Sequence, residues 1–301
     1  MNNRLEAADL PEITGSPARA GVSKVALPLV VAILCALLYL PVLIPLARQW
    51  INDPNYQHGV VVPIVSAALL WRQRAALRAA RPGGGSAAGV LFLVIASILL
   101  VGGTAASELF TARLSLPIML IGLLLVLRGR EFVSRALFPL LFLFLMVPLP
   151  YIIYYKFTFP MQIMSARLSS GLLRVLQIEV IRRGNTLILP NYTLEVIAAC
   201  SGLRSLMTMF ALAVILCAFS RLSTPGKVIL ALSSLPIAVA ANTVRLAVTA
   251  LGALAVGPSF ADGTLHEISG LIVFFTGFIM LLAMLGILKW TERKREPSSL
   301  S

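Results

Sequence analysis

Long apolar stretches, separated by short polar segments, run through almost the whole chain. A helix needs about 20 apolar residues to cross the hydrocarbon core of a bilayer. Eight stretches are bounded by charge, Gly or Pro, and we expect each to form a membrane span. They are Val25–Ala47, Gly59–Trp71, Ala87–Ala106, Leu114–Leu127, Ala136–Tyr155, Gly202–Phe219, Val228–Val256 and Ile268–Trp290. The second and fourth are short, so they form half-spans or recruit flanking residues.

The basic residues between these stretches indicate the orientation of the chain. Lys and Arg concentrate in cytoplasmic segments of membrane proteins. With the N-terminus inside, only Arg48 and Arg113 fall in the short outer loops, and both termini are cytoplasmic. The inner segments then hold Arg4, Arg19, Lys24, Arg72, Arg74, Arg78, Arg81, Arg128, Arg130, Arg135, Arg221, Lys227, Lys289, Arg293, Lys294 and Arg295.

One longer polar segment, Lys156–Ala199, lies outside the membrane in this topology. Apolar residues recur at near-helical spacing over Phe159–Ile178, which predicts an amphipathic helix in the membrane interface. The next two runs, Val180–Leu189 and Tyr192–Ala198, are rich in β-branched residues. They flank a Pro-Asn pair, and the pattern predicts a small β-hairpin on the outer face.

Composition agrees with an all-α polytopic membrane protein. The chain has 301 residues, of which 58% are hydrophobic and 12% charged, so no sizeable soluble domain fits beside the spans. We expect a polar cytoplasmic tail over 1–24, a transmembrane domain over 25–290 with the outer insert 156–199, and a second tail over 291–301. The first span is too long for a cleaved signal sequence and should remain as an anchor.

The net charge of +13 comes from short clusters of Lys and Arg between the apolar stretches, which is how a polytopic membrane protein fixes its topology. We therefore expect no nucleic-acid partner and membrane lipid as the surroundings. Three cysteines, an odd number, give no disulfide framework. Two histidines and scattered cysteines lack the spacing of a zinc site. The sequence therefore predicts no metal and no cofactor.

Ionisable groups at membrane depth are costly, so each is a functional hypothesis. Cys200 stands at the outer start of the sixth span, Arg245 near the outer end of the seventh, and His266 in the loop before the eighth. The predicted topology places all three at one membrane face. A thiol at a helix N-terminus, with Arg204 one turn on, favours thiolate. With His266 as acid and base and Arg245 as oxyanion holder, this set suffices for acyl transfer through a thioester.

Structural, non-catalytic interpretations of the same residues stay open. Arg245 could pair with Glu195 or Glu267, and Asn242 could be an interhelical hydrogen bonder. His266 could be a plain loop histidine, and the same alternative holds for the second histidine, His58. Cys35 and Cys217 are predicted to be packing residues. A transporter is one alternative function, although the span interiors lack Asp and Glu. A non-catalytic assembly factor for surface protein or exopolysaccharide export is the other.

Several motifs stand in a recognisable order: Tyr56-Gln57-His58-Gly59 with Trp71 behind it, Leu194-Glu195-Val196, Ala199-Cys200-Ser201-Gly202-Leu203-Arg204-Ser205, Asn242-Thr243-Val244-Arg245, and His266 ahead of Gly270. Together they resemble the exosortase/archaeosortase family of membrane cysteine transpeptidases. The resemblance implies Cys200, Arg245 and His266 as the catalytic triad. It implies supporting roles for Arg204, Asn242, Ser201, Glu195 and His58.

The resemblance also implies a substrate class and a location. Members of that family are expected to act on exported proteins with a three-part C-terminal sorting signal: a short Pro-Glu-Pro-type motif, a transmembrane helix and a basic tail. We therefore expect a cysteine protease or transpeptidase in the bacterial inner membrane. It would cleave near the motif, at a site facing the exterior, and pass the new carboxyl end to an acceptor.

Overall fold

The computed structural model describes residues 26–81, 83, 85–190, 192–196, 202–257, 260 and 264–295. The chain divides into two units, Met1–Leu40 and Pro41–Ser301. The boundary falls inside helix α1 (Ala26–Asn52), which contains Pro41 and Pro45.

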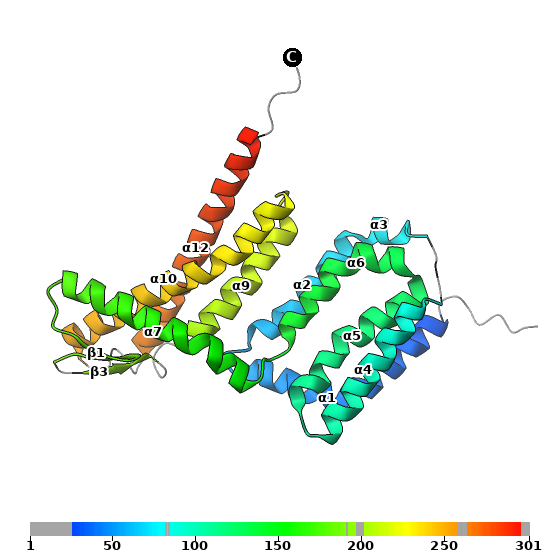
Figure 1. Ribbon diagram of the computed structural model, residues 1–301, viewed down its shortest axis with the longest axis horizontal. Helices are drawn as coiled ribbons and strands as arrows, with labels where there is room; N and C mark the ends of the chain where they lie inside the picture. The colour runs from blue at the N-terminus through cyan, green and yellow to red at the C-terminus, as the bar shows by residue number, and fades with distance from the viewer. Residues whose placement is uncertain are drawn as a thin grey trace, which may run out of the picture. The chain divides into compact units, whose positions relative to one another are not determined.

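Helices dominate the second unit (Figure 1). They are α2 (His58–Arg72), α3 (Arg74–Arg78), α4 (Ala87–Ala105), α5 (Leu109–Arg128), α6 (Arg130–Phe142), the 3-10 helix η1 (Leu143–Met146), α7 (Tyr151–Val175), α9 (Gly202–Phe219), α10 (Thr224–Val256) and α12 (Thr264–Arg295). The strands are β1 (Ile181–Arg183), β2 (Thr186–Ile188) and β3 (Thr193–Glu195). The prediction of an all-helical membrane protein with a small β element is confirmed.

The predicted number of eight spans is not confirmed. Among the described residues, five helices are long and apolar enough to cross a membrane: Leu29–Asn52 of α1, then α4, α5, α10 and Gly270–Lys294 of α12. The bent pair of α6–η1 and α7 brings the number to six. Helix α2 and Leu206–Phe219 of α9 are apolar but shorter. The fourth predicted stretch is no half-span, because flanking residues extend α5 to 20 residues.

The fifth stretch, predicted as one span over Ala136–Tyr155, is wrong as a continuous helix. The chain leaves η1 at Met146 and re-enters a helix at Tyr151, and the two helices meet at 93°. Pro148 and Pro150 lie in the break. A proline has no N–H to donate, and it disfavours helical geometry in the residue before it. Helix α7 therefore begins earlier than the predicted amphipathic helix.

The predicted hairpin is a three-stranded antiparallel sheet in the order β1-β2-β3. The run predicted as one strand folds back at Gly184, whose φ of +62° suits glycine, and Arg183 pairs with Thr186. Leu187 and Leu194 lie fully buried in a cluster that includes Leu246 of α10 and residues of α7. This packing fixes the sheet, and with it the end of β3, against the C-terminal half of α10.

Two groups of helices pack closely, the first of them through glycines. Helices α4 and α5 lie side by side (Figure 1), and a Cβ at Gly122 would lie 2.9 Å from the Leu93 nitrogen. Helices α9, α10 and α12 share a second core that includes Met209, Leu230 and Leu281. Small residues let backbones approach when lipid offers no hydrophobic drive between helices.

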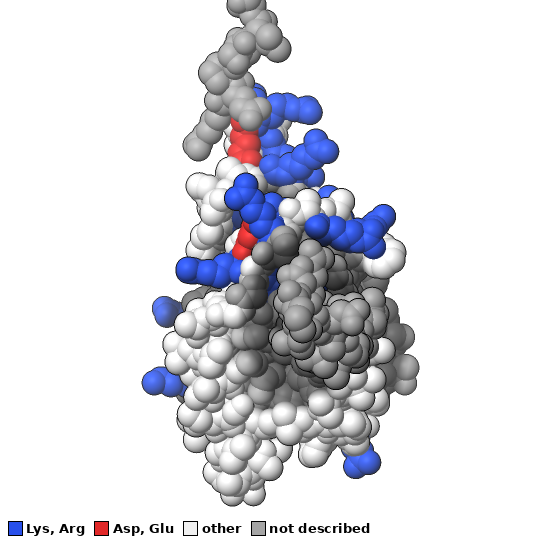
Figure 2. All heavy atoms as spheres, turned by 90° about the vertical axis from the view of Figure 1, so that its right-hand side faces the viewer, with Lys and Arg blue, Asp and Glu red and all other residues white. Residues whose placement is uncertain are grey.

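Basic segments predicted for the cytoplasmic side lie together in pairs. Arg135 of α6 donates to the Ala76 carbonyl of α3, and the Glu131 carboxylate accepts the Arg81 N–H at 3.1 Å. The turn before α10 contacts the end of α12, where the Ser223 N–H donates to Glu292 at 3.0 Å. Figure 2 shows most Lys and Arg side chains around the upper part of one face, above a largely uncharged surface.

Candidate active site

Helix α10 carries three polar residues on one face. Asn242, Arg245 and Thr249 follow at intervals of three and four residues, which stacks them on the same side of a helix. Asn242 is 3% exposed and Thr249 is fully buried. Within the described part of the chain, Asn242 Oδ1 and Thr249 Oγ1 have no hydrogen-bond partner. Buried polar atoms are normally paired, so an unpaired one in a native protein calls for an explanation such as a role in binding or catalysis.

The guanidinium of Arg245 lies against the backbone of α12 at Gly270. A Cβ atom built on Gly270 would lie 3.1 Å from Nη2 and 3.3 Å from Cζ of Arg245. Gly270 is one helical turn after His266 on the same face of α12. The packing of α10 on α12 therefore brings the guanidinium to the side of α12 that carries His266. The structure describes His266 itself only as helical backbone.

The register of α9 and α12 relates the start of α9 to this contact. A Cβ at Gly277 of α12 would lie 2.8 Å from Met209 Cε of α9. Both helices run in the same direction (Figure 1). Going back seven residues along each helix leads to Gly202 and to Gly270. We infer that α9 begins at about the level of the bundle at which the Arg245 guanidinium lies.

Two predicted site residues, Cys200 and Ser201, lie outside the described residues. Arg204 lies in the first turn of α9 and is described only as backbone. Glu195 ends β3 and is exposed, and it forms no ion pair with any described residue. The structure therefore does not support the interpretation in which Glu195 holds Arg245.

His58, the first residue of α2, belongs to another polar cluster. Trp50 Nε1 donates to the Met146 carbonyl at 2.9 Å, and the Tyr56 hydroxyl donates to the Leu149 carbonyl at 3.2 Å. The Tyr56 ring lies 6.4 Å from the His58 ring, centroid to centroid. Burial, followed by the neighbouring Tyr154, raises the pKa of Tyr56 to about 12, so its hydroxyl keeps the proton that it donates. This cluster holds the break between α6 and α7.

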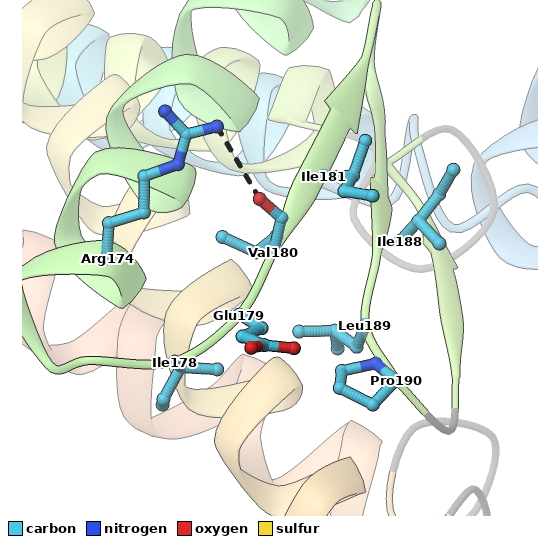
Figure 3. Close-up of a pocket in the computed structure, with 8 residues that line it drawn as sticks. All are labelled: Arg174, Ile178, Glu179, Val180, Ile181, Ile188, Leu189 and Pro190. Carbon is cyan, nitrogen blue, oxygen red and sulfur yellow. Dashed lines mark hydrogen bonds between the residues drawn. The ribbon is translucent and has the colours of Figure 1, made fainter.

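Two hollows adjoin α7. The first, of about 620 Å³, lies between the C-terminal end of α7 and the sheet (Figure 3), where Arg174 points towards the Val180 carbonyl 3.5 Å away. The second is an apolar groove of about 450 Å³ between α7 and α10. Met161, Met164, Leu168, Leu235, Pro236, Val239 and Ala240 line it. On α10 this groove ends two residues before Asn242.

The family model described as Transmembrane exosortase (Exosortase_EpsH) matches residues 50–283. The chain belongs to the transmembrane exosortase family. No curated protein and no solved structure matches it significantly. The matched region of this exosortase includes Trp50, Cys200, Arg245 and His266. Family membership places the chain among membrane proteins that generally act as cysteine transpeptidases on sorting-signal substrates.

Sequence reasoning did not identify all residues of this candidate site. Thr249 was not predicted, although its spacing from Asn242 and Arg245 in an otherwise apolar helix is a usable signal. The sequence gives no such signal for the contact between Gly270 and the guanidinium, because this contact depends on which helix packs against α10. Among the described residues, no group of three His, Cys, Asp or Glu side chains could hold a metal ion.

Proposed function

We propose that this exosortase is a cysteine protease or transpeptidase that cleaves the C-terminal sorting signal of exported proteins. Cys200 is the nucleophile, His266 the acid and base, and Arg245 the oxyanion holder. The observation that carries the proposal is the contact of the Arg245 guanidinium with α12 at Gly270, one helical turn after His266. A cation that holds the oxyanion stabilises a tetrahedral intermediate, and a proton donor for the leaving amine lets that intermediate collapse to products.

The cycle begins when Cys200 Sγ, as thiolate, attacks the carbonyl carbon of the scissile peptide bond. Negative charge moves to the carbonyl oxygen, where the Arg245 guanidinium stabilises it. The C–N bond then breaks, His266 protonates the leaving amine, and a thioester remains. Water or an amine attacks this thioester and gives its proton to His266. The C–S bond breaks and returns the thiolate, which Arg204 stabilises from the first turn of α9.

The apolar groove between α7 and α10 supports a substrate with a hydrophobic tail helix. All seven residues that line it are apolar, and two are methionines, whose flexible side chains fit varied partners. An apolar helix bound there would place the residues before it near Asn242 and Arg245. The basic tail of such a substrate would then reach the side on which the basic helix ends gather.

A substrate that is exported and carries a transmembrane helix implies where the enzyme resides. The enzyme is a multi-pass protein of the bacterial inner membrane, with both termini in the cytoplasm and the site open to the exterior. Asn242 contributes its unpaired oxygen to the bound substrate, and Ser201 and Glu195 flank the nucleophile in the sequence. His58 supports the site indirectly, from the cluster at the break between α6 and α7.

The test uses a tagged exported protein that carries a candidate sorting signal, co-expressed with the exosortase. Intact mass spectrometry compares the substrate from wild type, Cys200→Ala and Cys217→Ala cells. Cys217 is a matched control, because it is buried in the core of α9, α10 and α12 and its thiol contacts the Lys227 carbonyl at 3.3 Å. We expect loss of the tail in wild type and Cys217→Ala, and an intact tail in Cys200→Ala. Cleavage by Cys200→Ala at the wild-type rate would refute the proposal.

A further inference from the structure

We propose that Gly270 is a positioning residue for Arg245, which rests on the proposed function of Arg245 as oxyanion holder. The missing side chain at position 270 leaves a flat seat on α12 for the guanidinium. This seat fixes the distance between the cation and the part of α12 that carries His266.

The distances show that any side chain at position 270 would crowd the guanidinium. A Cβ at position 270 would lie 3.1 Å from Nη2 and 3.3 Å from Cζ, whereas ordinary contacts of a Cβ lie between 3.4 and 4 Å. Nη1, at 3.7 Å, would be in ordinary contact. An alanine would therefore displace one edge of the guanidinium by a few tenths of an ångström or more. Larger side chains would fill the seat completely.

Backbone conformation does not explain this glycine. Gly270 lies inside α12, and its φ is not among the positive values of the chain. Within a helix glycine is less stable than alanine, so a helical position without other demands favours alanine. Gly286 of the same helix has nothing within 4 Å of its Cβ position. Of these two glycines, only Gly270 has a guanidinium at the position of its missing Cβ, and Gly286 is exposed.

The seat makes α12 a common support for two groups of the proposed mechanism. His266 lies four residues before Gly270, a rise of about 6 Å along the same face. The length of the Arg245 side chain would allow its guanidinium many positions, but the seat selects one next to α12. A cation displaced by about 1 Å loses much of its stabilisation of a transition state, and such errors cost up to about 100-fold in rate.

The first experiment measures kcat and KM for signal cleavage by Gly270→Ala, with Gly286→Ala as the matched control. Because the shift is a few tenths of an ångström rather than 1 Å, we expect kcat of Gly270→Ala to fall about 3- to 10-fold with little change in KM. Gly286→Ala should keep both wild-type values. In an Arg245→Lys background the addition of Gly270→Ala should change kcat less than about 2-fold, because a lysine has no planar group to seat. Wild-type kcat in Gly270→Ala, or an equal loss in both backgrounds, would overturn the proposal.

A second measurement needs no activity and separates this inference from the proposed function. Thermal unfolding is compared for Gly270→Ala in the wild-type and Arg245→Ala backgrounds. Where the guanidinium is absent, alanine should raise Tm by about 2–4 °C, and where it is present the gain should vanish or reverse. The same Tm change in both backgrounds would refute the seat. Coupling of the two sites without Cys200-dependent cleavage would leave the seat standing and refute the proposed function.

Discussion

The indole of Trp50 lies against Gly59 at the position that a Cβ would occupy. From there its Nε1 donates to the Met146 carbonyl at 2.9 Å, while the Tyr56 hydroxyl donates to the Leu149 carbonyl at 3.2 Å. The Leu149 carbonyl lies in the break between η1 and α7, and the Met146 carbonyl lies at its edge, where the two prolines cannot continue the backbone ladder. The Tyr56–Gly59 motif therefore has a structural task, which is to hold the turn that leads into α7.

Replacing Gly59 with alanine should destabilise the protein, because the added methyl group displaces the indole from the Met146 carbonyl. We expect a loss of about 1–3 kcal/mol, as for other buried groups deprived of a partner. Thermal unfolding in detergent measures it, with Gly102→Ala of α4 as control, since nothing lies within 4 Å of that Cβ position. Equal melting temperatures of the two variants would contradict this account.

Asn242→Leu should separate stability from activity. The Asn242 oxygen is buried and has no partner among the described residues, so its removal costs no hydrogen bond in the resting protein. We expect an unchanged or slightly higher Tm and a kcat lowered about 10- to 100-fold. Unfolding and signal cleavage are measured on the same preparation. A variant that is active, or that fails to fold, would show that the side chain acts only in packing.

A tryptophan at Val239 should fill the apolar groove between α7 and α10. If a substrate helix binds there, KM for a substrate with an apolar tail rises about 10-fold or more, while kcat changes little. Leu232→Trp is the control, because Leu232 is on the same helix, 59% exposed, and does not line the groove. Unchanged KM in Val239→Trp would place the substrate helix elsewhere.

Protonation of Glu108, the N-cap residue of α5, should lower the stability of the protein in acid. Hydrogen bonds from the Thr111 hydroxyl and then from its N–H hold the pKa of the Glu108 carboxyl below its usual range. Its contribution to stability is thus present above the ordinary pKa of glutamate, and it is lost as the pH falls through the lowered value. Glu108→Gln should lower Tm by about 1–2 °C near neutral pH, and the difference should shrink in acid. A difference that does not depend on pH would indicate that the charge plays no part.

The sequence predicted the helices well and one break badly. Apolar length located α4 and α5, because a lipid-facing helix must be apolar over most of its surface. The break at Pro148 was missed because prolines also occur inside intact helices of this chain, at Pro63, Pro117 and Pro236. Two prolines two residues apart remove two donors within one turn, and this spacing is the signal that a count of apolar residues does not register.

The chemistry of the site could be predicted only where a residue is unusual for its surroundings. Arg245 stands out in an apolar helix because a charge at membrane depth is costly. Gly270 and Trp50 are ordinary residues for a membrane protein, and their roles arise from helices that meet only in the folded chain. Whether Cys200, Arg245 and His266 act as a triad stays a prediction for the cleavage experiment.

The break between α6 and α7 has a mechanical consequence. Helical backbone hydrogen bonds do not continue across it. Two side-chain hydrogen bonds, from Trp50 and Tyr56, connect it to the end of α1 and to the segment between α1 and α2. The angle between the two helices therefore depends on an indole and a phenol. Since α7 forms one wall of the apolar groove, a change in this angle would widen or narrow the groove.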